Sequence, residues 1–149
     1  MTAPIDPNRS LAVSPPALAF PSAPLTWWRT LPPESLDLTA QRHLRAVLVA
    51  APPLPLPGWD AAIRADPAAA IGVALTILAE GVARPGSLDR ALSAVLVCAA
   101  LGDPACRDLL VHVLGRRARR RADLDALRLA RRWRGWGHQG SASVIAPGR

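Results

Sequence analysis

The chain contains no lysine and no tyrosine, and only one phenylalanine, one methionine and two cysteines occur among its 149 residues. All 18 basic residues are therefore arginines. Alanine is abundant at the same time, and this combination is typical of a GC-rich, bacterial genome. The number of arginines thus says little about function, whereas their positions are informative.

Residues that support catalysis or bind metals are few. Cys98 and Cys106 lie in predicted helices, and we interpret them as buried, inert thiols rather than as a disulfide bridge. The histidines His43, His112 and His138 belong to no Cys-x-x-Cys or His-x-x-x-His spacing. Nucleotide-binding loops and hydrolase motifs are also missing. We therefore predict no enzymatic activity, no metal, no cofactor and no small-molecule substrate.

Apolar runs are too short for a membrane span, which needs about 20 residues. Residues 67–79 and 91–102 are uncharged, and both lengths fit buried core helices. Residues 10–28 are uncharged as well, but four prolines interrupt them. We predict a cytoplasmic protein. The alternative is secretion, with residues 1–24 acting as a signal peptide.

Three apolar helices are predicted within residues 66–114. Proline follows Asp66 and Asp103, which is typical of a helix start because aspartate caps free N–H groups and proline fits the first helical position. The second helix follows a Pro-Gly break, with Ser87 as its cap, and Gly102 ends it in the left-handed conformation. This second helix is the predicted central buried helix, because apolar residues occupy most of its faces.

Each of these helices has a predicted apolar face. In the first helix the face consists of Ile71, Ala74, Leu75, Leu78 and Val82. In the second it consists of Leu88, Ala91, Leu92, Val95, Leu96 and Ala99. In the third, whose apolar run stops at Gly115, it consists of Cys106, Leu109, Leu110, Val113 and Leu114.

The junction of the second and third helices carries Ala99-Ala100-Leu101-Gly102-Asp103, followed by Cys106 and Leu109-Leu110. This pattern resembles a fragment of Sel1-like or tetratricopeptide-type helical repeats over about forty residues. The resemblance implies a helical hairpin, and we assign no family from it.

An amphipathic helix precedes this block, and Asp37 or Thr39 caps it; its apolar face consists of Ala40, Leu44, Val47, Leu48 and Ala51. Residues 52–57 contain four prolines and are predicted to be extended, as polyproline II. We prefer a rigid strap over a ligand for an SH3-like domain, with the inward-facing side chains Leu54, Leu56 and Trp59.

The N-terminal residues 1–34 are rich in proline and lack helical periodicity, so we predict a disordered tail there. Trp27 and Trp28 lie within it. Either these rings pack back on the helical core, or they anchor the surface of a partner.

Positive charge is concentrated near the C-terminus. Residues 116–134 contain nine arginines and two aspartates, an excess of seven charges that equals the formal net charge of the whole chain, +7. The candidate anion-binding or nucleic-acid-binding residues are Arg116, Arg117, Arg119, Arg120, Arg121, Arg128, Arg131, Arg132, Arg134, Trp133 and Trp136.

Two backbone arrangements fit this basic segment. If residues 116–136 form one helix, a narrow apolar stripe follows it through Ala118, Ala122, Ala126, Leu129, Trp133 and Trp136. Alternatively, Gly115 is a joint and Asp123 caps a separate, shorter helix.

Three interpretations of the segment compete. In the first, Leu129, Trp133 and Trp136 dock on the core while the arginines form a solvated face. In the second, arginines bind phosphates and tryptophans stack on bases. In the third, the segment binds an acidic protein or an anionic membrane surface.

We predict an all-α protein, a small bundle of four to five antiparallel helices in residues 35–137. A Pro-rich tail precedes the bundle and a flexible, Gly-rich tail follows it in residues 138–149. The predicted function is a non-catalytic protein-interaction module, with another protein or a second copy of the chain as partner. The alternative is a nucleic-acid-binding accessory protein that uses residues 116–136.

Overall fold

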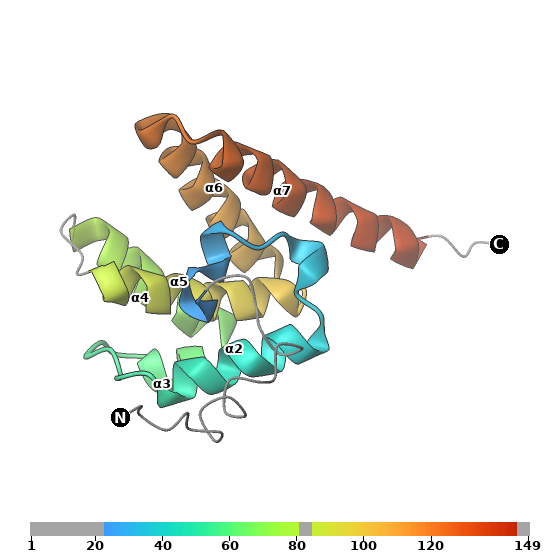
Figure 1. Cartoon of the computed structure of the whole chain (residues 1–149). Coiled ribbons are helices and arrows are strands. Elements are labelled where there is room, and N and C mark those ends of the chain that lie inside the picture. Colours follow the sequence, from blue (N-terminus) through green and yellow to red (C-terminus); the bar gives the residue numbers. More distant parts are fainter. Residues whose placement is uncertain (1–22, 81–84, 146–149) are drawn as a thin grey trace, which may run out of the picture.

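A computed structural model describes residues 23–80 and 85–145, and their backbone forms helices without strands (Figure 1). In chain order the 3-10 helices (η) and α-helices are η2 (Pro24–Arg29), η3 (Pro33–Ser35), α2 (Leu38–Ala50), α3 (Trp59–Ile63), α4 (Pro67–Glu80), α5 (Pro85–Ala100), α6 (Pro104–Arg121) and α7 (Leu124–Ile145). The predicted all-α class is confirmed. None of the helices in the described ranges combines the length and apolarity needed to cross a membrane.

Helix α5 lies at the centre of the core. Every residue from 91 to 99 is buried, and η2, α2, α4 and α6 all pack on this helix. Ser93 is the one polar side chain in that run, and its hydroxyl donates a hydrogen bond to the carbonyl oxygen of Leu25 at 3.1 Å. The prediction of a central buried helix is therefore confirmed. Its start is different, because Pro85 takes the first helical position and Ser87 lies inside the helix.

The tryptophan pair of η2 belongs to this core. Trp27 and Trp28 are 0% and 2% exposed, and Nε1 of Trp28 donates to Oδ1 of Asp89 on α5 at 2.8 Å. Burying two indole rings removes a large apolar area from water, so residues 23–34 join the fold. The prediction of a disordered tail across 1–34 is wrong for this part, and residues 1–22 lie outside the described residues. The two rings are also too buried to anchor a partner, which corrects that alternative.

The predicted helix caps are largely present. Asp37 accepts a hydrogen bond from the backbone N–H of Ala40 at 2.9 Å, and Asp103 accepts one from Cys106 at 2.8 Å. Each carboxylate satisfies an N–H group that has no partner within its own helix. Gly102 has a φ of 107°, as predicted for the residue that ends α5.

The predicted face of α4 is shifted. The buried residues are Ala70, Val73, Ala74 and Ile77, whereas Leu75 is 50% exposed. Helix α4 is apolar on nearly all sides, so its sequence period does not select one face. Packing against α3 and α5 makes the selection instead.

The proline-rich link between α2 and α3 is a strap, as predicted. Leu54 and Trp59 are buried, and Leu56 is half-buried. A guanidinium N–H of Arg90 on α5 donates to the carbonyl oxygen of Pro52. The strap therefore closes over one end of the central helix.

The basic segment forms parts of two helices. Helix α6 runs through Gly115 to Arg121, and the chain turns at Ala122, which has a φ of 51°. Asp123 then caps α7 by accepting from the N–H of Ala126 at 3.1 Å. The predictions of a single helix over 116–136 and of a joint at Gly115 are therefore wrong. The prediction of a separate helix capped by Asp123 is confirmed.

Helix propensity and packing explain these outcomes. Good helix formers flank Gly115, and Leu114 and Ala118 are buried around it, which outweighs the propensity cost of about 1 kcal/mol for a glycine. Helix α7 packs mainly on α6, on the side of the molecule away from α2 and α3 (Figure 1). Its backbone stays helical to Ile145, past the predicted end of the bundle at residue 137.

Alanine substitutions at Leu96 and Leu101 test whether α5 is the centre of the core. Leu96 is 0% exposed, so Leu96→Ala leaves a cavity and should lower the free energy of unfolding by about 2–5 kcal/mol. Leu101 is 57% exposed, so Leu101→Ala should change it by no more than about 0.5 kcal/mol. Urea unfolding of both variants measures the difference. Equal losses would contradict a core centred on α5.

Candidate anion-binding surface

The nine predicted arginines lie on helices α6 and α7, which pack against each other. We call this set the arginine surface: Arg116, Arg117, Arg119, Arg120, Arg121, Arg128, Arg131, Arg132 and Arg134. Arg116 and Arg117 are partly buried, and the other seven are exposed. The surface therefore combines the C-terminal half of α6 with the solvent-facing side of α7.

The apolar stripe of α7 holds this helix against α6. Ala126, Leu129 and Trp133 are buried, and Trp133 is 0% exposed. No described group accepts a hydrogen bond from its indole N–H. Trp136 is 40% exposed. The two tryptophans predicted to stack on bases are thus separated, because Trp133 is a core residue and only Trp136 faces solvent.

Three arginines of the surface form ion pairs with carboxylates. Arg132 pairs with Glu34 at 2.7 Å, Arg128 with Asp125 at 3.3 Å, and Arg117 with Asp123 at 3.6 Å. All three pairs are partly or largely exposed, so they add little stability. Within residues 23–80 and 85–136, no carboxylate pairs with Arg116, Arg119, Arg120, Arg121, Arg131 or Arg134.

The pKa of Arg117 reflects the charged groups around its side chain. Burial lowers the pKa of its guanidinium, and the positive charges of Arg121 and Arg29 lower it further. Asp123 acts in the opposite direction without reversing the shift. The positive charge around Arg117 is therefore only partly compensated.

The end of α6 gives a local reason for part of this cluster. Arg119, Arg120 and Arg121 lie in its last turn, where the free carbonyl groups carry partial negative charge. This interaction offsets some of the repulsion among the three guanidinium groups. It does not involve the arginines of α7.

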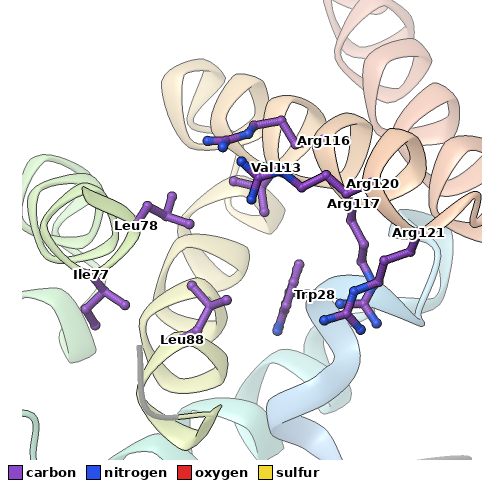
Figure 2. A pocket seen from close by; sticks show the side chains of 9 residues that line it. All are labelled: Trp28, Ile77, Leu78, Leu88, Val113, Arg116, Arg117, Arg120 and Arg121. Atoms are coloured by element: carbon purple, nitrogen blue, oxygen red, sulfur yellow. The ribbon is translucent and has the colours of Figure 1, made fainter. Parts of the chain in front are cut away.

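Two hollows flank Arg117. The first, which we call the arginine pocket, has a volume of about 430 Å³; its lining consists of Trp28, Ile77, Leu78, Leu88, Val113, Arg116, Arg117, Arg120 and Arg121 (Figure 2). The second has a similar volume of about 430 Å³, and its lining includes both Asp123 and Asp125. The two hollows therefore differ in charge, because only the second contains carboxylates.

Within the described side chains, Cys98, Cys106, His43 and His112 form no site with the arginine surface. Cys98 and Cys106 are free and buried. A hydrogen bond to Cys98, together with burial, raises the pKa of the Cys106 thiol, which keeps it protonated at neutral pH. His112 is exposed on α6, and His43 lies beside Trp27 with ring centroids 6.0 Å apart. Across the described ranges, no three His, Cys, Asp or Glu residues lie close enough to hold a metal ion.

Comparison with protein-family models, with curated proteins and with solved structures found no significant match to this chain.

The arginine pocket is a feature that the sequence did not predict. Its apolar lining comes from η2, α4, α5 and α6, which are far apart in the chain. One signal was present in the sequence, because Arg116, Arg117, Arg120 and Arg121 have the i, i+1, i+4, i+5 spacing of one helix face. The apolar residues opposite these arginines come together only in the folded chain.

The two tryptophans of α7 should differ in their effect on stability. Trp133→Ala removes a fully buried ring and should lower the free energy of unfolding by about 3–5 kcal/mol. Trp136→Ala should cost less than about 1 kcal/mol, because the ring is largely solvated. Urea unfolding followed by circular dichroism measures both. Similar costs for the two variants would contradict the docking of α7 through Trp133.

Proposed function

We propose that this chain is a non-catalytic interaction module whose arginine surface binds an acidic segment of a protein partner. The observation that carries the proposal is the cluster of exposed arginines on α6 and α7 that have no carboxylate partner in the described parts of the chain. Planar guanidinium groups pair with carboxylates in a bidentate geometry, so an acidic segment is a complementary ligand.

The distribution of charge supports a binding role over a merely solvated face. Outside residues 116–134, nine arginines and nine acidic residues balance each other. The chain thus collects its whole excess charge on two neighbouring helices, although like charges repel there. Charge segregated in this way favours association with a partner of opposite sign.

The aromatic residues favour a protein partner over single-stranded nucleic acid. Recognition of single strands relies on exposed rings that stack on successive bases. Trp133 is buried, so Trp136 is the only tryptophan of the segment that is available for stacking. Duplex nucleic acid needs only phosphate contacts, and it is the second candidate ligand because the surface is dense in arginine.

The other predicted partners gain less support. Exposed large apolar residues belong to separate helices and loops, as Leu38, Leu75 and Leu124 illustrate, which does not favour insertion into a membrane surface. A second copy of the chain also gains less support as partner, because the apolar residues 91–99 of the central helix are covered within one chain.

The test compares two charge-matched variants of the full chain. Arg119→Gln/Arg131→Gln/Arg134→Gln removes exposed arginines of the surface, and Arg42→Gln/Arg45→Gln/Arg64→Gln removes exposed arginines elsewhere. Fluorescence anisotropy follows binding of a labelled acidic peptide and of single- and double-stranded oligonucleotides of equal charge. We expect peptide affinity to fall at least about tenfold in the first variant only, which is about 1.4 kcal/mol.

Equal losses in both variants would show that net charge alone drives binding, and would refute the surface. Tighter binding to the duplex would favour the nucleic-acid alternative, with a slope of log K against log salt of about −0.9 for each neutralised phosphate. Circular dichroism of each variant confirms that it is folded.

A further inference from the structure

We propose that the arginine pocket binds a small amphiphilic anion, an acyl-type chain that ends in a carboxylate or a phosphate. The ligand differs in kind from the protein partner proposed above, and the site is a hollow rather than an open surface. Four rim residues, Arg116, Arg117, Arg120 and Arg121, also belong to the arginine surface, but the pocket does not require an acidic protein partner. The inference rests on the chemistry of two opposed sides of one pocket.

The floor of the pocket is apolar and comes from four helices. Ile77 and Leu78 belong to α4, Leu88 to α5, Val113 to α6 and Trp28 to η2. The volume of about 430 Å³ lies within the range of about 300–1,000 Å³ that is typical of small-molecule sites. An inorganic anion needs no such floor, whereas an alkyl chain does.

The rim of the pocket is positive. Figure 2 shows the side chains of Arg117 and Arg121 converging beside Trp28, while Arg116 and Arg120 extend past Val113. No acidic residue is among the nine that line the pocket. Arg116, Arg120 and Arg121 pair with no carboxylate in the described parts of the chain, so a negatively charged ligand complements the rim better than a neutral lipid does.

The charge state of the rim supports an anion as occupant. Burial and the neighbouring Arg121 lower the pKa of Arg117, so the positive charges of these two groups repel each other, and the pair with Asp123 compensates only part of that repulsion. An anion between these two groups would relieve that repulsion. The second hollow is less positive, because the carboxylates of Asp123 and Asp125 are part of its own lining.

Trp28 is held in place before any ligand arrives. Its indole N–H donates to Asp89 at 2.8 Å, and the guanidinium carbon of Arg29 lies 5.9 Å from its ring centroid. Because this ring is only 2% exposed, it forms a fixed wall behind the floor, and the half-buried Leu78 and Leu88 supply the more accessible apolar area. Floor and rim are thus both formed in the folded chain.

The binding test uses four probes on the full chain, each below the concentration at which it aggregates. Decanoate and decyl phosphate carry both a chain and a charge, inorganic phosphate has the charge alone, and decanol has the chain alone. Isothermal titration calorimetry should show decanoate or decyl phosphate binding at least about tenfold more tightly than either partial probe. The stronger of the two amphiphiles distinguishes a carboxylate ligand from a phosphomonoester.

Matched variants locate the site. Arg121→Gln removes a rim charge, and Leu78→Glu places a carboxylate in the floor; both should weaken amphiphile binding at least about tenfold. Arg42→Gln and Leu75→Glu are the controls, since both residues are exposed, neither lines the pocket, and Arg42 lies outside the arginine surface. We expect the controls to bind as the unchanged chain does.

Four results would overturn the proposal. If inorganic phosphate bound as tightly as the amphiphiles, the apolar floor would contribute nothing to binding. If decanol did so, the arginine rim would contribute nothing. Equal weakening in Arg42→Gln and Arg121→Gln would show that net charge, and not the pocket, drives binding. Undiminished binding in Arg121→Gln would place binding elsewhere, and this exposed variant keeps the test decisive if Leu78→Glu does not fold, as thermal unfolding will show.

Discussion

The burial of α5 is the constraint on which the rest of the structure depends. A helix that is buried from residue 91 to residue 99 needs cover on every side, and η2, α2, α4 and α6 provide it. The tryptophans of η2 and the strap that ends at Trp59 are drawn into the same core. Helix α7 is then left to pack mainly on α6 through one narrow stripe, so its remaining sides face solvent.

This arrangement explains where the arginines lie. They occupy the solvent side of α7 and the end of α6 that extends past the covered core, where guanidinium groups need no buried partner. Three of these arginines pair with Glu34, Asp123 and Asp125. The other six form no ion pair with a carboxylate in the described parts of the chain. The fold thus concentrates positive charge beside an apolar hollow, and both features point to anionic ligands.

Much of the fold could be predicted from local signals. Asp37 and Asp103 cap helices through their own carboxylates, and the apolar density of α5 requires burial wherever its neighbours lie. The face of α4 could not be predicted, because a helix that is apolar all round takes its orientation from α3 and α5. The burial of Trp27 and Trp28 likewise depends on the packing of η2 against α5, which lies far along the chain and which no local pattern reveals. The lining of the arginine pocket comes from four helices that are far apart in the chain. Only the spacing of its arginines on α6 could therefore be recognised in the sequence.

The central claim is that the fold holds the arginines of α6 and α7 ready for a multivalent anion. Thermal unfolding of the full chain with and without tripolyphosphate, at constant ionic strength, tests it most directly, since a ligand that binds only the folded state raises the melting temperature. We predict a clear increase for the unchanged chain and for Arg42→Gln/Arg45→Gln/Arg64→Gln, and a much smaller one for Arg119→Gln/Arg131→Gln/Arg134→Gln. The same increase in all three proteins would contradict the claim, because it would show that the arginine surface has no special affinity for anions.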